Sequence, residues 1–216
     1  MSIDQVSQEV TRIALEGFKE ASLTGVHIGS YGRDLIPRTS LLELLKRLDS
    51  HPSDVMFRIS SLEPMDCNEA VIDLVARSGR FAPHFHLPLQ NASDQVLRAM
   101  RRPYSLDYYR RLVNMVRSRM PDAGIGSDLV VGFPGETFED VEANLTYLPA
   151  SPLTYLHVFP YSDRPGTEAS GMAGKIDKKN IRERARTIRS IGRDLAASFR
   201  LSQVGGVRSA ITIDGG

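Results

Sequence analysis

The stretch "SDLVVGFPGET", residues 127–137, decides how the chain is interpreted. Its apolar run at 129–131 is typical of a buried strand. Glycine and proline at 132–135 end that strand at once, and the residues after them begin a helix. The strand also carries a carboxylate, Asp128, which is costly in an apolar sheet unless it is paired. We therefore expect a strand, a turn and a helix here, with an acidic group that needs a partner.

Strands and helices alternate on both sides of this stretch. The predicted strands lie within residues 20–26, 55–64, 84–90, 124–136 and 153–162. At least one helix follows each strand, and the last helix runs from about Asp177 to Ser202. Such alternation indicates a parallel sheet with helices outside, so the class is α/β. An open doubly wound sheet and a (β/α) barrel both fit, and in both the ligands bind at the carboxyl ends of the strands.

Polar residues predict where several helices begin. Ser2 with Gln5 and Thr137 with Asp140 have the spacing of a capping box. Asp66 and Glu69 are expected to cap the helix that follows the second strand.

Polar residues and glycines also gather where the predicted strands end. They are Thr24, Gly25, Glu63, Gln90, Asp128, Gly132, Pro134, His157, Tyr161 and Arg164. Because parallel strands end at one edge, these groups could converge on a ligand. Simpler interpretations stay open: Glu63 could accept bonds from strand hydroxyls, the histidines at 84 and 86 could be structural, and residues 132–135 could form only a tight turn. The turn is not a P-loop, since it lacks the Lys-Ser/Thr pair.

Composition is that of an ordinary soluble domain. The chain has 216 residues, of which 41% are hydrophobic and 25% charged, and these values are typical of globular proteins. The one cysteine, Cys67, excludes an intrachain disulfide and a multi-cysteine metal site within this chain. We find no apolar run of about 18 residues and no signal-peptide pattern, so we expect a cytoplasmic protein with no membrane contact.

Charge is unevenly distributed. Residues 175–200 carry a local charge of +6, whereas the rest of the chain carries −5. A basic helix on an acidic body suits contact with a polyanion, and a solvated helix face explains it as well.

Five stretches together identify a resemblance to a known family. They are "LTGVHIGSYGRDL", "RISSLEPMD", "HLPLQNASDQVLRAMRRPYS", "SDLVVGFPGETFED" and "LHVFPYSDRPGT". They resemble the radical S-adenosylmethionine methylthiotransferases, which add a methylthio group to a tRNA adenosine or, in one branch, to a ribosomal protein. The first two stretches are most similar in sequence to the branch that acts on threonylcarbamoyladenosine. The isopentenyladenosine branch is the next most similar. The resemblance implies a partial (β/α) barrel with parallel strands inside and helices outside.

The chain also departs from the family pattern. The CxxxCxxC motif that ligates a [4Fe–4S] cluster is absent, and so is the preceding domain with its second cluster. We therefore expect a fragment: residues 1–203 as a partial catalytic barrel without its first strand, and residues 204–216 as the first strand or linker of a truncated RNA-binding β-domain. The exposed edge of the strand at 20–26 would favour self-association.

The resemblance implies roles for individual residues. Contacts to S-adenosylmethionine are expected from Thr24, Gly25, Glu63, Gln90, Asp128, Val130, Gly132 and Pro134. Contacts to the tRNA substrate are expected from His157, Tyr161, Arg164, Arg182, Arg186, Arg189 and Arg193. We assign no catalytic residue and no metal ligand in this chain. In this interpretation the bound ligand supplies the partners of Asp128, and the glycine-rich turn lets backbone lie against the nucleoside.

Two other functions remain open. The chain could be a tRNA-binding scaffold that kept the fold and lost the cluster chemistry. It could also be a small phosphate-binding α/β enzyme, with phosphate bound at residues 132–137.

Overall fold

The computed structural model describes residues 1–207 and residue 210. The α-helices are α1 (Ile3–Leu15), α2 (Leu41–Asp49), α3 (Glu69–Arg77), α4 (Asp94–Ala99), α5 (Leu106–Arg119), α6 (Phe138–Ala150) and α7 (Lys178–Ser202). The strands are β1 (Glu20–Leu23), β2 (Met56–Ile59), β3 (His84–His86), β4 (Gly124–Val131) and β5 (Tyr155–Pro160). Short 3₁₀ helices lie at Ile28–Ser30, Pro64–Asp66 and Glu168–Gly171. The strand expected within residues 204–216 falls mostly on residues outside the described part, so the second domain stays a prediction.

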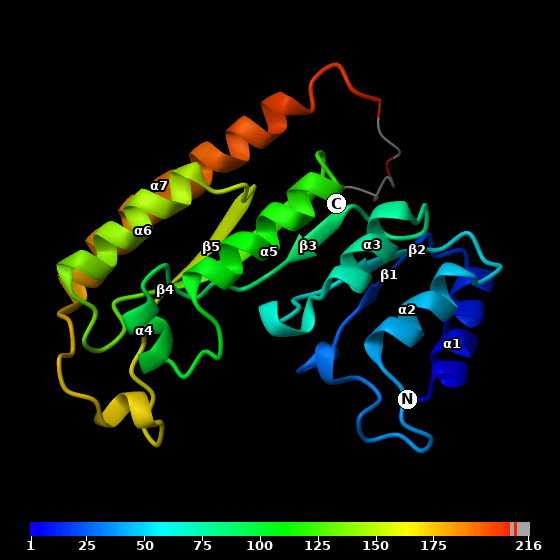
Figure 1. The fold of residues 1–216 in the computed structure, drawn as a ribbon, viewed down its shortest axis with the longest axis horizontal. Helices are drawn as coiled ribbons and strands as arrows, with labels where there is room; N and C mark the ends of the chain where they lie inside the picture. The colour runs from blue at the N-terminus through cyan, green and yellow to red at the C-terminus, as the bar shows by residue number, and fades with distance from the viewer. Residues whose placement is uncertain (208–209, 211–216) are drawn as a thin grey trace.

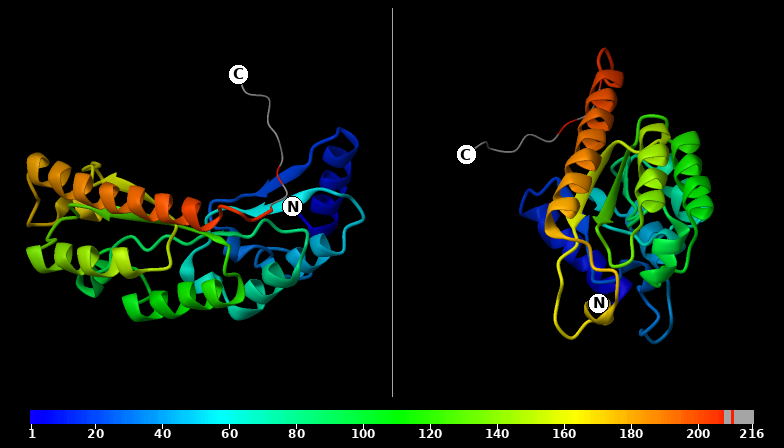
Figure 2. Two further views of the ribbon diagram at one scale, coloured as in Figure 1. Left: turned by 90° about the horizontal axis from the view of Figure 1, so that it is seen from above. Right: turned by 90° about the vertical axis from the view of Figure 1, so that its left-hand side faces the viewer.

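The five strands are parallel and lie side by side in chain order. β1 pairs with β2, and β4 lies between β3 and β5. Two parallel bridges, Phe57 to Phe81 and Ser61 to His86, join the two groups into one curved layer. The helices follow the convex side of this layer from α1 at one end to α7, which packs on β5, at the other (Figures 1 and 2). This half-barrel confirms the expected partial barrel and excludes a doubly wound sheet, whose helices would cover both faces.

Alternation along β4 separates the core from the open face. Ile125, Leu129 and Val131 are buried beneath the helices. Asp128 and Val130 point the other way, onto the concave face. Asp128 is therefore not a charge inside the apolar core.

Two capping boxes confirm the predicted helix starts. The Ser2 and Gln5 pair begins α1, and the Thr137 and Asp140 pair begins α6. In each box the first side chain accepts a backbone N–H, and the second reaches back to the first residue.

The predicted cap of α3 is wrong. Asn68 caps this helix, because its Oδ1 accepts the N–H of Val71 at 3.1 Å. Glu69 is only the first helical residue. Asp66 lies in the preceding 3₁₀ helix, and its carboxylate is engaged by His27 Nε2 at 2.6 Å.

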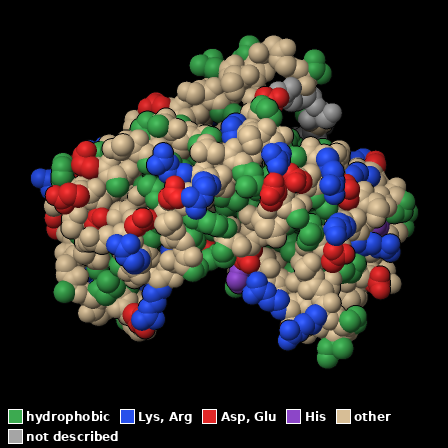
Figure 3. Space-filling view, viewed as in Figure 1, with side chains coloured by type: hydrophobic (Ala, Val, Ile, Leu, Met, Phe, Trp, Pro, Cys, Tyr) green, Lys and Arg blue, Asp and Glu red, His purple; other side chains and the backbone are tan. Residues whose placement is uncertain are grey.

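Two features of the surface bear on partners. β1 is hydrogen-bonded only to β2, so its other edge has no strand beside it among the described residues. The molecule is hollowed between the loop regions at the two ends of the sheet, with Lys and Arg side chains on both rims (Figure 3). None of the helices in the described part is long and apolar enough to span a bilayer.

Candidate functional site

Asp128 lies at the centre of a hydrogen-bonded cluster on the concave face. Its Oδ1 atom is 3.0 Å from His86 Nε2 on β3 and 3.2 Å from His157 Nδ1 on β5. The Tyr155 hydroxyl extends the cluster: it lies 3.1 Å from His86 Nδ1 and 2.8 Å from His84 Nε2. Three neighbouring strands thus contribute to one continuous network.

One set of tautomers satisfies the contacts among His84, Tyr155, His86 and Asp128. Burial lowers the pKa of His84 to about 4, so this ring is neutral at pH 7. Its Nε2–H then donates to Tyr155, whose hydroxyl donates to His86 Nδ1. The His86 Nε2–H is left to donate to Asp128. Burial acts to raise the pKa of Asp128, but the bonds from His86 and His157 outweigh it and the pKa is lowered, so Asp128 is a carboxylate.

Asp128 keeps one oxygen for a ligand. Both histidines bond to Oδ1, and Oδ2 accepts no hydrogen bond from any described residue. The expectation that a bound ligand supplies the partners of Asp128 is therefore corrected. His86 and His157 supply them from within the chain, and Oδ2 remains as an acceptor for hydroxyl or cationic groups.

The glycine-rich turn after β4 has a packing role. Gly132 has a φ of +80°, and a Cβ added there would lie 2.4 Å from Ile181 Cγ1 on α7. Glycine is thus required by the close approach of α7, and the expected contact of this backbone with a nucleoside stays a prediction. Val130 and Phe133 face the cavity described below, whereas Gly132 and Pro134 do not line it.

A buried carboxylate that the sequence interpretation missed supports this turn. Glu136 is only 5% exposed. Its Oε2 accepts the Gly132 N–H at 2.9 Å and Arg184 Nη1 at 2.8 Å, and its Oε1 accepts Asn91 Nδ2 at 3.0 Å. In the sequence Glu136 looks like an ordinary acid at the start of a helix. Its role is visible only in the structure, where Arg184 of α7 contacts it.

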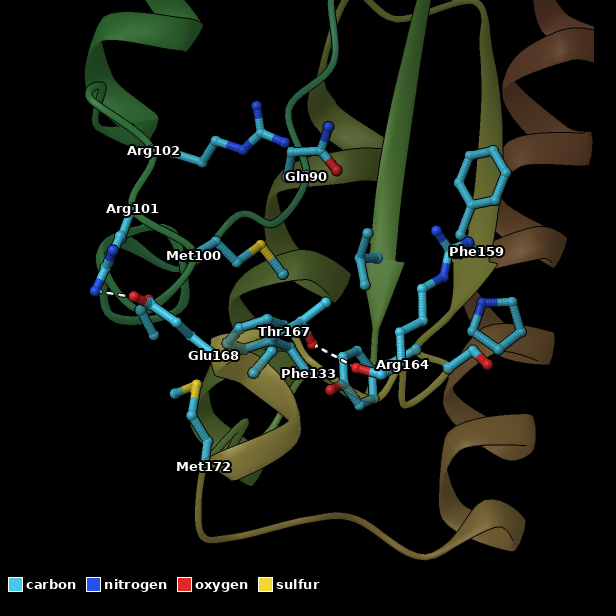
Figure 4. A pocket seen from close by; sticks show the side chains of 16 residues that line it. Gln90, Met100, Arg101, Arg102, Phe133, Phe159, Arg164, Thr167, Glu168 and Met172 are labelled. Atoms are coloured by element: carbon cyan, nitrogen blue, oxygen red, sulfur yellow. Dashed lines mark hydrogen bonds and ion pairs between the residues drawn. The ribbon is translucent and has the colours of Figure 1, made fainter.

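A cavity of about 670 Å³ opens where β4 and β5 end (Figure 4). Four residues expected at the site line it together: Gln90, Val130, Tyr161 and Arg164. The end of α4 and the loop before α7 form its remaining walls. Its volume suits a nucleoside-sized ligand.

Gln90 and the aromatic wall shape this cavity. Gln90 has a left-handed backbone with φ of +70°, and it is held by its N–H to the Asp128 carbonyl and by its carbonyl to the Val130 N–H, both at 2.8 Å. The rings of Phe133 and Tyr161 meet edge to face with centroids 5.6 Å apart. The Tyr161 hydroxyl is buried and has no hydrogen-bond partner among the described residues.

The remaining predicted S-adenosylmethionine contacts lie elsewhere. Both oxygens of Glu63 are 3.1 Å from Arg102 Nη1, so an arginine and not a strand hydroxyl is its partner. Glu63 lines a neighbouring cavity of about 320 Å³ that shares Arg102 with the first. Thr24 lines a separate groove beside α1, and Gly25 lines neither cavity.

The basic helix α7 presents a row of exposed arginines. Its inner face packs through Ile181, Ala185, Ile188 and Gly192, which are buried. The four predicted tRNA contacts, Arg182, Arg186, Arg189 and Arg193, are all exposed. Their spacing of four, three and four residues places them along one side of the helix.

The described residues offer one group of possible metal ligands and one free thiol. The ligand atoms of His86, Asp128 and His157 lie within 4.8 Å of one another, and these residue types could hold a divalent cation. Cys67 is a poor ligand, because burial raises the pKa of its thiol to about 12. A [4Fe–4S] cluster needs several thiolates, so the residues of this chain do not fit one.

The match to a family model decides the family. The model of the radical SAM superfamily matches residues 1–148, which is more than half of the chain. The chain belongs to this superfamily. The half-barrel is thus the fold of a radical SAM domain, as the resemblance implied.

Similar curated proteins are tRNA-modifying enzymes. Threonylcarbamoyladenosine tRNA methylthiotransferase of Thermotoga maritima is 35% identical over 204 residues, which cover 94% of this chain and 46% of that protein. The enzyme of the same name from Aquifex aeolicus is 32% identical over 99% of this chain and 52% of its own length. The tRNA-2-methylthio-N(6)-dimethylallyladenosine synthase of Streptomyces viridosporus is 34% identical over 96% of this chain and 41% of its own length. The radical SAM chain thus spans about half the length of the curated relatives it matches.

Solved structures confirm the fold. Coproporphyrinogen III oxidase from Escherichia coli superposes with a TM-score of 0.66 at 17% identity, over 89% of this chain and 45% of that chain. The methyltransferase TsrM from Kitasatospora setae gives a TM-score of 0.63 at 18% identity, over 78% of this chain and 33% of that chain. At these identities the likeness concerns the fold alone.

Proposed function

We propose that this chain is the S-adenosylmethionine-binding half-barrel of a cytoplasmic tRNA methylthiotransferase that modifies an adenosine, with threonylcarbamoyladenosine as its substrate. The observation that carries the proposal is Asp128. Two histidines bond to its Oδ1, its Oδ2 accepts no hydrogen bond from the part of the chain that the structure describes, and it lies beside a nucleoside-sized cavity. The relatives named above supply the reaction class.

The residues around Asp128 fit S-adenosylmethionine. Its Oδ2 would accept the hydroxyls of the ribose diol, which are two donors close together. The amide of Gln90 and the backbone near Val130 would then flank the adenine in the cavity. Bound S-adenosylmethionine would supply a 5′-deoxyadenosyl group or a methyl group, one of them from each molecule bound.

The protein's own contribution is placement. The His86 and His157 bonds fix the direction of the Asp128 carboxylate, so a diol that binds Oδ2 has one orientation. Phe133 and Tyr161 exclude water from one wall of the cavity. A cluster is not held by this chain, whose single cysteine cannot ligate one.

The exposed arginine row of α7 suits the tRNA backbone. A regular row of guanidinium groups matches a line of phosphates, and such contacts position a nucleic acid without specifying its sequence. The substrate base would then enter the cavity beside Arg164 and Tyr161.

Analysis of tRNA from the organism that encodes this chain tests the proposal. Disruption of the gene should remove the methylthio group from threonylcarbamoyladenosine in digested tRNA, as measured by liquid chromatography and mass spectrometry. The intact gene and its Glu142→Ala variant, which changes an exposed acid of α6, should restore the modification. The Asp128→Ala variant should not restore it. Unchanged threonylcarbamoyladenosine methylthiolation after disruption would refute the proposed substrate, and unchanged methylthiolation of every nucleoside would leave only a scaffold function.

A further inference from the structure

Arginines dominate the charge of the large cavity. Its lining contains Arg101, Arg102, Arg164 and a single acid, Glu168. Phe133 and other apolar side chains form much of the remaining wall, so a planar base has a surface to lie on. A ligand that fills this cavity without an anionic group would cover guanidinium groups from water and add no partner to the acids that they already contact.

Arg101 has an unusual backbone for its residue type. Helix α4 ends in a Schellman motif: the Arg101 N–H bonds to Arg98 O and the Arg102 N–H bonds to Leu97 O, both at 2.9 Å. This places Arg101 in the left-handed region with φ of +56°. Glycine or asparagine usually occupies this position, because other side chains are strained there. An arginine at such a site indicates a use for its side chain beyond ending the helix.

The side chain of Arg101 is available for exchange. Its Nη2 lies 2.6 Å from Glu168 Oε2 in the loop before α7, and this pair borders the cavity (Figure 4). The two side chains are 76% and 72% exposed, so the pair is weak and a better placed carboxylate could replace Glu168. Arg102, by contrast, is held on both oxygens of Glu63.

The relatives act on adenosines with two different N6 groups. A threonylcarbamoyl group carries a carboxylate, whereas a dimethylallyl group is a hydrocarbon. We propose that Arg101 is the specificity-determining residue that selects an adenosine whose N6 substituent carries a carboxylate. This inference rests on the proposed function, in which the cavity receives the modified adenosine. Arg164 would assist, because it lines the same cavity.

Binding of free nucleosides to the 216-residue chain tests the inference without phosphate groups or added S-adenosylmethionine. Calorimetry would compare threonylcarbamoyladenosine, its neutral carboxamide analogue and dimethylallyladenosine. The carboxylate nucleoside should bind about tenfold more tightly than either neutral one, the effect expected of a charged hydrogen-bonded pair. Arg101→Asn should remove most of this preference and leave the neutral nucleosides unchanged. Asparagine tolerates the left-handed backbone, so the fold should persist, and thermal unfolding checks this.

Two further variants sharpen the result. Arg101→Lys keeps the charge and should restore part of the preference, whereas Arg200→Asn, at the far end of α7, should change nothing. Equal affinity for all three nucleosides, no nucleoside binding, or an equal loss for all three in Arg101→Asn would overturn the inference. A loss of S-adenosylmethionine affinity in Arg101→Asn, with nucleoside affinities unchanged, would assign Arg101 to the cofactor carboxylate and also overturn it. The proposed function has a separate test: unchanged methylthiolation of tRNA after disruption of the gene would refute it, whatever the nucleoside binding shows.

Discussion

Replacement of Glu136 by alanine should destabilise the protein strongly. The change removes the acceptor of three hydrogen bonds, from Gly132, Asn91 and Arg184. Loss of one partner of a buried ion pair typically costs about 3–5 kcal/mol, because the other charge stays buried and unpaired. The Arg184 side chain is 21% exposed and can recover some hydration, so we expect about 3 kcal/mol. That is a large part of the usual stability of a domain, about 5–15 kcal/mol.

Urea unfolding followed by circular dichroism measures this free energy. Glu142→Ala, an exposed acid on the same helix, is the matched control and should change stability by less than about 0.5 kcal/mol. In a double-mutant cycle with Arg184→Met, the double variant should be more stable than the sum of the single changes predicts, by at least about 1 kcal/mol. A cost below about 1 kcal/mol for Glu136→Ala, or strict additivity with Arg184→Met, would refute the argument that the pair supports the turn.

Three other predictions concern RNA, the sheet edge and pH. Arg182→Glu combined with Arg186→Glu should weaken the binding of all tRNAs alike. The slope of the logarithm of the binding constant against the logarithm of salt concentration should become less negative by about 0.9 per lost phosphate contact. Salt-independent binding would instead show that α7 is a solvated face. The free edge of β1 should produce concentration-dependent self-association in light scattering, reduced by Ser22→Pro, and a monomer at every concentration would contradict this. Unfolded His84 binds a proton at its usual pKa of 6.5 but the folded ring only near 4, so the free energy of unfolding should fall by up to about 3 kcal/mol between these pH values. In urea unfolding at pH 7 and 4.5, the free energy of unfolding of His84→Gln should fall less between the two pH values than that of the unaltered chain. An equal fall in both proteins would show that His84 does not cause it.

The order of strands and helices was predictable because it depends on local patterns. Apolar runs, glycines and capping residues mark each element, and these signals act within a few residues. The predicted cap of α3 was wrong, although capping also depends on neighbouring residues. Asn68 lies between the two acids and accepts the N–H of Val71 in their place.

The site was predictable only in part, because long-range register decides its contacts. That Asp128 needs a partner followed from burial cost, but the identity of His86 and His157 depends on how three strands align. Glu136 acquires its role from Arg184, 48 residues later, and no local pattern indicates this. Gly132 likewise depends on the approach of α7.

Binding of S-adenosylmethionine to this chain tests the central claim most directly. Calorimetry should show saturable, weak binding to the 216-residue chain. Asp128→Ala should weaken it by about 1–3 kcal/mol, the range for a lost hydrogen-bond partner of a ligand, while Glu142→Ala leaves it unchanged. Equal affinity of the Asp128→Ala and unaltered chains, with the fold intact, would make Asp128 a purely structural residue and contradict the account.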